Sequence, residues 1–133
     1  MKYVYTLLCF VLLTSCNDTD FTLSGSEPAS TITFNVTTTS ANKSAKIRTV
    51  FIESGFFKFD NTVDTNLPYK KRYTEEINFA ANLGFDYEDK TTGTFNSYTI
   101  TVEILRDNTL VEKKDFLIDV SGKKVNLDVM INK

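Results

Sequence analysis

Apolar and polar residues alternate with a period of two along most of the chain from Thr31 onward. This alternation is typical of β-strands that bury one face. Strands or strand-like apolar stretches are expected at residues 31–37, 46–53, 56–59, 96–105, 110–120 and 125–131. In the most regular of them, 96–105, the side chains expected to face inward are Tyr98, Ile100, Val102 and Ile104. About seven short strands separated by turns predict an all-β domain over residues 31–133, an immunoglobulin-like antiparallel β-sandwich.

Two turns divide the last third of the chain. Asp107 and Asn108 are expected to form a tight hairpin, because Asp and Asn tolerate the positive φ that such a turn needs. The pair Ser121-Gly122 is expected to make the next turn. We therefore predict that the last three strands form a β-meander, in which each strand pairs with the next.

Residues 74–84 fit two structures. Thr74 is a plausible helix N-cap and Gly84 a plausible helix end, whereas Tyr73, Ile77 and Phe79 alternate as in a strand. We favour a strand followed by a loop, because every neighbouring segment is β and one short helix would have little to pack against. The helix remains the alternative.

The chain begins with a segment unlike the rest. Lys2 precedes an almost uncharged apolar stretch, residues 3–13, which as a helix would cover roughly 16 Å, about half of a bilayer's hydrocarbon layer. Such a stretch is typical of an export signal and too short for a membrane span. It ends in Leu13-Thr14-Ser15-Cys16, which resembles the lipobox of bacterial lipoproteins. We therefore predict a signal peptide over residues 1–15 and a lipid on Cys16; the alternative is a free thiol in an ordinary leader.

Residues 16–30 are expected to tether the domain to this anchor. The segment is polar, contains Gly25 and Pro28, and lacks strand or helix periodicity. A coil of about 14 residues spans roughly 20 Å. Asp18 and Asp20 either carry sorting information or belong to a solvated linker. We expect an envelope protein, on the outer membrane of a Gram-negative bacterium and facing either the periplasm or the surface, with the inner membrane still open.

Three segments of the domain resemble the MmpS-type domain, a small extracytoplasmic β-sandwich of membrane transport accessory proteins. They are Ile32–Thr37 (its opening strand), Asn66–Lys70 (its proline-aromatic turn) and Tyr98–Glu112 (its hairpin). The chain differs from better-known members in its lipobox in place of a transmembrane helix and in Tyr69 in place of tryptophan. The resemblance implies an MmpS-like β-sandwich in the envelope and a possible role beside a transporter.

Composition excludes several kinds of chemistry. The 133 residues include no His and only two Cys, so Ser-His and Cys-His catalysis and the usual zinc sites lack their groups. Lys+Arg 15 against Asp+Glu 17 gives a net charge of -2, without the basic surface that nucleic-acid binding requires. We expect no enzyme activity, no nucleic-acid partner, and no cofactor besides the covalent lipid on Cys16.

Carboxylates are the remaining candidates for metal binding or catalysis. The densest group is Asp86, Glu88 and Asp89, of which Asp86 and Glu88 would share one face of a strand. Two carboxylates can also hydrolyse a glycoside if they converge in a cleft. Asp60 and Asp64 are a weaker version of the same pattern. The alternative, which we favour, is the solvated end of a strand.

Aromatic residues are the candidates for ligand binding. In a regular strand Phe57 and Phe59 would face one way and Phe56 the other. An outward Phe56 could form an apolar patch with Tyr69 or Tyr73. In the alternative that we favour, Phe56 covers an edge of the core.

Three functions remain from the sequence. The first is a non-enzymatic, lipid-anchored module that binds a protein or supports a membrane complex, possibly one for transport. The second is a surface lipoprotein that binds a glycan or another small ligand through rings near Phe56 and Tyr69. The third is a carboxylate-based enzyme, which requires Asp86 and Glu88 to converge in a cleft.

Overall fold

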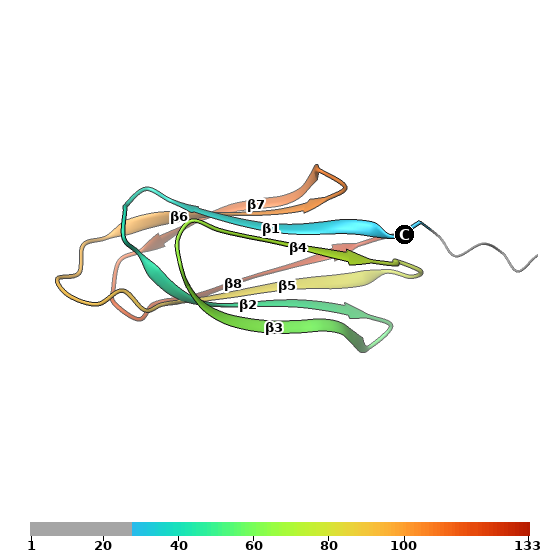
Figure 1. Ribbon diagram of the computed structural model, residues 1–133, viewed down its shortest axis with the longest axis horizontal. Coiled ribbons are helices and arrows are strands. Elements are labelled where there is room, and N and C mark those ends of the chain that lie inside the picture. Colours follow the sequence, from blue (N-terminus) through green and yellow to red (C-terminus); the bar gives the residue numbers. More distant parts are fainter. Residues whose placement is uncertain (1–27) are drawn as a thin grey trace, which may run out of the picture.

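A computed structural model describes residues 28–133, so the predicted signal peptide and Cys16 lie outside the described part. Eight strands form two four-stranded antiparallel sheets, and these residues contain no helix (Figure 1). The order is β4-β1-β6-β7 in the first sheet and β3-β2-β5-β8 in the second. The all-β sandwich is confirmed. The strands are β1 Ser30–Thr38, β2 Ser44–Glu53, β3 Phe56–Asn66, β4 Tyr69–Glu75, β5 Ala81–Asp89, β6 Tyr98–Arg106, β7 Thr109–Ile118 and β8 Lys124–Ile131.

The core lies between the two sheets and is made by the inward positions that alternation predicts. On β6 all four expected side chains are buried, with exposed fractions of 3% or less. Phe34 of β1 stands at the centre, fully buried, with ring centroids 6.2 to 6.5 Å from those of Phe59, Tyr73 and Phe85. Rings and branched side chains from both sheets therefore fill the space between the sheets.

The predicted meander is wrong in its last strand. β6 and β7 form the expected hairpin, with Asp107 and Asn108 at φ 50° and 65°. β8 then crosses to the other sheet and pairs with β5. Alternation specifies which side chains of β8 point inward, but not which strand accepts its backbone hydrogen bonds. The crossing leaves β7 as an edge strand, where its central charged residues remain in solvent.

The ambiguous segment is a strand and a loop, so the helix alternative is wrong. β4 ends at Glu75, the chain loops over residues 76–80, and β5 begins at Ala81. Inside the loop Ile77 is buried, and the backbone N–H groups of Asn78 and Phe79 donate to the carboxylate of Glu53, 2.6 and 2.9 Å away. These donors are satisfied by a distant side chain instead of a helical turn.

The sandwich has two distinct ends (Figure 1). At the first, which we call the N-terminal end, β1 begins, β8 ends, and the chain turns between β2 and β3, β4 and β5, and β6 and β7. The other four connections lie at the distal end. Asp107 fixes the start of β1, because its Oδ1 accepts from the N–H of Thr31 at 2.7 Å and its own N–H donates to the Thr31 carbonyl at 2.9 Å.

Candidate functional site

The three carboxylates singled out from the sequence do not form one cluster. Asp86 and Glu88 share the outer face of β5, as predicted, while Phe85 and Tyr87, which alternate with them, are buried. Asp89 points the other way and is only 2% exposed. Residues 28–133 hold no group of three or more side chains suited to bind a metal ion.

Asp86 and Glu88 instead line a hollow on the outer face of the second sheet. The hollow has a volume of about 450 Å³, and its charged and polar lining includes Lys46, Arg48, Asp86, Glu88, Lys124 and Asn126. It spans β2, β3, β5 and β8. Its size falls within the range of ligand pockets, but it lies on the outer face of a sheet, not in an enclosed cleft.

Ion pairs neutralise the carboxylates of this hollow. Arg48 donates from Nε and Nη2 to both oxygens of Asp60, each at 2.8 Å, and from Nη1 to Asp86 at 3.2 Å. These bonds, chiefly those to Asp60, raise the pKa of Arg48, and the bonds from Arg48 lower the pKa of Asp60. Bidentate pairing of this kind fixes the guanidinium in one orientation.

Glu88 is similarly held. Its carboxylate accepts from Lys90 Nζ at 2.7 Å and lies 3.8 Å from Lys124 Nζ. The bond from Lys90 is the main reason that the pKa of Glu88 lies below its usual value. Glu88 therefore contributes a negative charge to the hollow at neutral pH, beside the positive charges of Lys90 and Lys124. The hollow is suited to non-covalent binding of a charged surface.

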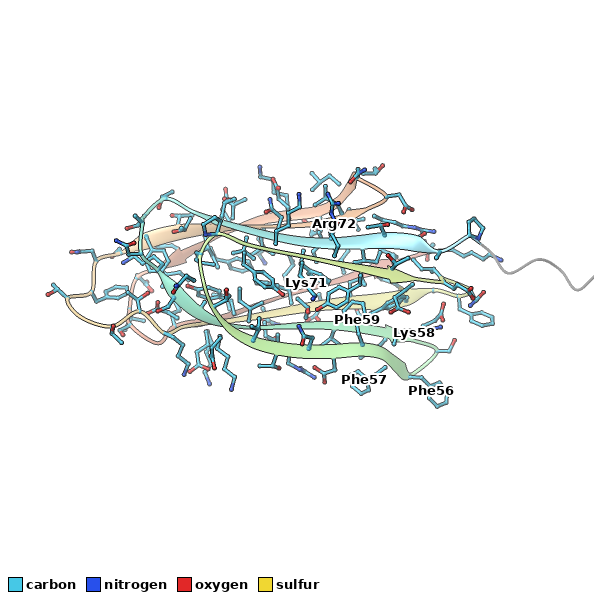
Figure 2. All side chains as sticks on the ribbon, in the orientation of Figure 1. Phe56, Phe57, Lys58, Phe59, Lys71 and Arg72 are labelled. Carbon is cyan, nitrogen blue, oxygen red and sulfur yellow. The ribbon has the colours of Figure 1, made fainter. Side chains whose placement is uncertain are left out.

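The aromatic residues are arranged differently from the prediction. A β-bulge at Lys58 lets Phe51 pair with Phe59 and Ile52 with Phe57, so Phe57 and Phe59 face opposite sides. Phe59 packs on the core, whereas Phe57 is exposed. Phe56 is 77% exposed and therefore does not cover an edge of the core. Figure 2 shows Phe56 and Phe57 projecting away from the sandwich and Phe59 turned toward it.

Tyr69 and Tyr73 do not join Phe56. The ring of Tyr73 stacks on Phe59, with centroids 3.7 Å apart, and its hydroxyl bonds with Thr49 at 2.7 Å. Tyr69 begins β4 at the distal end, opposite to Phe56, and burial raises its pKa to about 12. The predicted patch of Phe56 with Tyr69 or Tyr73 is not formed, because one tyrosine closes the core and the other lies at the far end.

Asp89 has a structural role that the sequence did not reveal. Its Oδ1 accepts from the Tyr98 hydroxyl at 2.7 Å and the N–H of Thr91 at 3.1 Å, and its Oδ2 accepts from the N–H of Gly122 at 3.1 Å. The Tyr98 hydroxyl also bonds with that of Tyr87, at 2.6 Å. Asp89 thereby ties two distal loops to the core. Its place two residues after Tyr87, in the same alternation, is the signal that could have indicated inward burial.

Sequence reasoning also missed two exposed apolar residues. Phe79 in the β4–β5 loop is 63% exposed and Met130 of β8 is 73% exposed. Phe79 alternates with Tyr73 and Ile77, which predicts a strand, and Met130 stands between Val129 and Ile131 in the alternating stretch 125–131. An apolar residue at an outward position was the signal that could have marked Met130.

The described part contains no helix that is long and apolar enough to cross a membrane. The lipid site predicted at Cys16 lies outside the described residues. The MmpS-type resemblance therefore stays a prediction from sequence: no protein-family model, curated protein or solved structure matches the chain.

Proposed function

We propose that this chain is a non-enzymatic module of the cell envelope, anchored by a lipid on Cys16, which binds a protein partner through the hollow on the second sheet. The outer membrane is the proposed location, and a transport complex is the partner that the MmpS-type resemblance suggests. The lipobox supports the anchor, and the compact β-sandwich supports a binding role.

The hollow is the observation that carries the binding proposal. Its rim mixes Lys46, Arg48 and Lys124 with Asp86 and Glu88, on a face that is open to solvent. An open surface with both signs of charge suits a complementary protein surface, where charge pairs set orientation and specificity. The Arg48 pairs with Asp60 and Asp86 keep its shape before a partner arrives.

The other two functions have less support. A ring-based ligand site needs Phe56 and Tyr69 side by side. Phe56 begins β3 at the N-terminal end of the sandwich, whereas Tyr69 begins β4 at the distal end. A carboxylate enzyme needs Asp86 and Glu88 to converge in a cleft, whereas they line an open hollow in which Arg48 and Lys90 hold them in ion pairs.

The anchor predicts a loss of membrane association in Cys16→Ser. With no thiol at residue 16 no lipid can be attached, and the described domain has no helix to replace it. We expect the wild-type chain to float with membranes in a density gradient and the variant to stay in the soluble fraction. Intact mass should show acyl chains on wild type alone. Flotation of Cys16→Ser at the wild-type level would contradict the anchor.

The partner site predicts position-specific cross-linking in native membranes. A photoreactive residue in place of Asn126, at the rim of the hollow, should form a protein adduct, and Lys46→Glu with Lys124→Glu should reduce it at least severalfold. The matched control is the same residue in place of Thr74, which is exposed on the other sheet. Equal adducts at both positions, or none, would reject the hollow as the binding site.

A further inference from the structure

Exposed apolar side chains gather at the N-terminal end of the sandwich. Seven large apolar side chains are exposed in residues 28–133, and two of them, Leu117 and Val120, lie toward the distal end. The other five, which include every exposed phenylalanine in this range, lie at the N-terminal end: Phe56, Phe57, Phe79, Leu110 and Met130. Isolated exposed apolar residues are common, but three rings at one end indicate an interaction surface.

Two of these side chains belong to one row across the second sheet. Phe57 pairs with Ile52, Ile52 with Asn82, and Asn82 with Met130, so four strands contribute neighbouring side chains to the outer face. Phe57 is 59% exposed, and Phe56, which pairs with Glu53 at the start of the hairpin, also projects away from the sandwich (Figure 2). The bulge at Lys58 creates this arrangement, because it turns Phe57 outward.

Glu53 holds the two aromatic segments of this end together. Its buried carboxylate belongs to the strand that leads into Phe56 and accepts from the backbone of the loop that carries Phe79. Lys58 Nζ lies 3.1 Å from the same carboxylate. Burial alone would raise the pKa of Glu53, but the bonds from Phe79, Asn78 and Lys58 hold it below its usual value. The carboxylate is therefore charged and fully paired, and the rings stand on a rigid support.

We propose that Phe56, Phe57, Phe79 and Met130 form a membrane-docking surface, which rests on the lipid bilayer to which Cys16 attaches the chain. This inference depends on the lipid anchor of the proposed function. β1 begins at Ser30, at the same end as the four side chains. The tether predicted from the sequence, about 14 residues between Cys16 and Ser30, would as a coil span roughly 20 Å. The anchor would therefore hold this end of the domain, and not the distal end, close to the lipid.

The chemistry of the surface fits a bilayer. Phenyl rings and a thioether carry no polar group that would remain unpaired among acyl chains. The nearest buried charge, Glu53, is already neutralised by Lys58. An anchor with several acyl chains holds the chain firmly by itself, so docking would mainly set the orientation of the domain.

Docking through the N-terminal end, with the strands upright on the bilayer, would leave the hollow accessible. Along β2, Arg48 and Lys46 lie four and six residues from Ile52, which corresponds to about 13 and 20 Å in a strand. The distal loops would stand farthest from the lipid, roughly 30 Å along the strands from the N-terminal end. The docked domain would thus present its charged hollow to a partner above the membrane surface.

Tryptophan fluorescence can test the docking, because the chain contains no tryptophan of its own. Phe57→Trp is introduced into the full chain, and the processed, lipidated protein is reconstituted in phosphatidylethanolamine and phosphatidylglycerol vesicles with brominated acyl chains. The matched control is Val120→Trp, at a distal position that is 58% exposed against 59% for Phe57. We expect a blue shift and severalfold stronger quenching for Phe57→Trp than for Val120→Trp.

A second variant assigns the effect to the surface. Adding Phe56→Ser and Phe79→Ser to Phe57→Trp should abolish most of the quenching, whereas flotation and the circular dichroism of the folded domain should be unchanged. Equal quenching of the two tryptophans in protein that floats would overturn the docking and leave the anchor standing. Protein that does not float would overturn both. A blue shift of the Phe57→Trp emission in native membranes but not in the vesicles would also overturn the docking, and it would indicate a protein partner.

Discussion

Phe34→Ala is expected to lower the free energy of unfolding by about 4 kcal/mol. The side chain is fully buried and contacts three rings, those of Phe59, Tyr73 and Phe85, which come from both sheets. Removing it loses the burial of a whole ring and leaves a cavity that rigid aromatic neighbours cannot fill. Urea unfolding, followed by circular dichroism, measures the change.

The matched control for this substitution is Phe56→Ala. The same atoms are removed, but the ring of Phe56 is 77% exposed, so the expected change is within about 0.5 kcal/mol. A loss below about 1 kcal/mol for Phe34→Ala, or equal losses for the two variants, would contradict the described core. The control also shows whether the membrane-docking surface can be altered without unfolding the domain.

Asp89→Ala is expected to lower the free energy of unfolding by about 3 kcal/mol. The substitution leaves the Tyr98 hydroxyl and the N–H groups of Thr91 and Gly122 without their charged acceptor. The two distal loops that these groups belong to would lose their common attachment to β5. Asp86→Ala is the matched control, since the Asp86 side chain is 52% exposed on the same strand and should change stability by at most about 0.5 kcal/mol. Equal effects of the two variants in urea unfolding would contradict the assigned role.

The same carboxylate should make stability depend on pH. Burial raises the pKa of Asp89, but hydrogen bonds from Tyr98, Thr91 and Gly122 outweigh it and hold the pKa below its usual value. A lowered folded-state pKa stabilises the fold above the unfolded value of about 3.9, and this stability is lost as the pH falls through the folded value. Wild type should therefore lose more stability than Asp89→Ala between neutral pH and acid. Parallel pH profiles would refute this.

The candidate sites could be predicted only in part. That Asp86 and Glu88 share an outer face follows from the two-residue period of a strand, and β5 has this arrangement. Their partners Arg48 and Lys124 come from β2 and β8, which local spacing does not identify. The prediction that Phe57 and Phe59 face the same way is wrong, because a bulge at Lys58 changes the period and no residue type at that point signals it.

The all-β character, the inward residues of β6 and the turn at Asp107 and Asn108 follow from the amino-acid sequence. These features depend on side-chain alternation and on backbone preferences of single residues, which are local properties. The pairing of β8 with β5, the burial of Asp89 and the gathering of Phe56, Phe79 and Met130 at one end are visible only in the folded domain. Each of these depends on which strands lie side by side and in what register, so residues far apart in the chain decide them together.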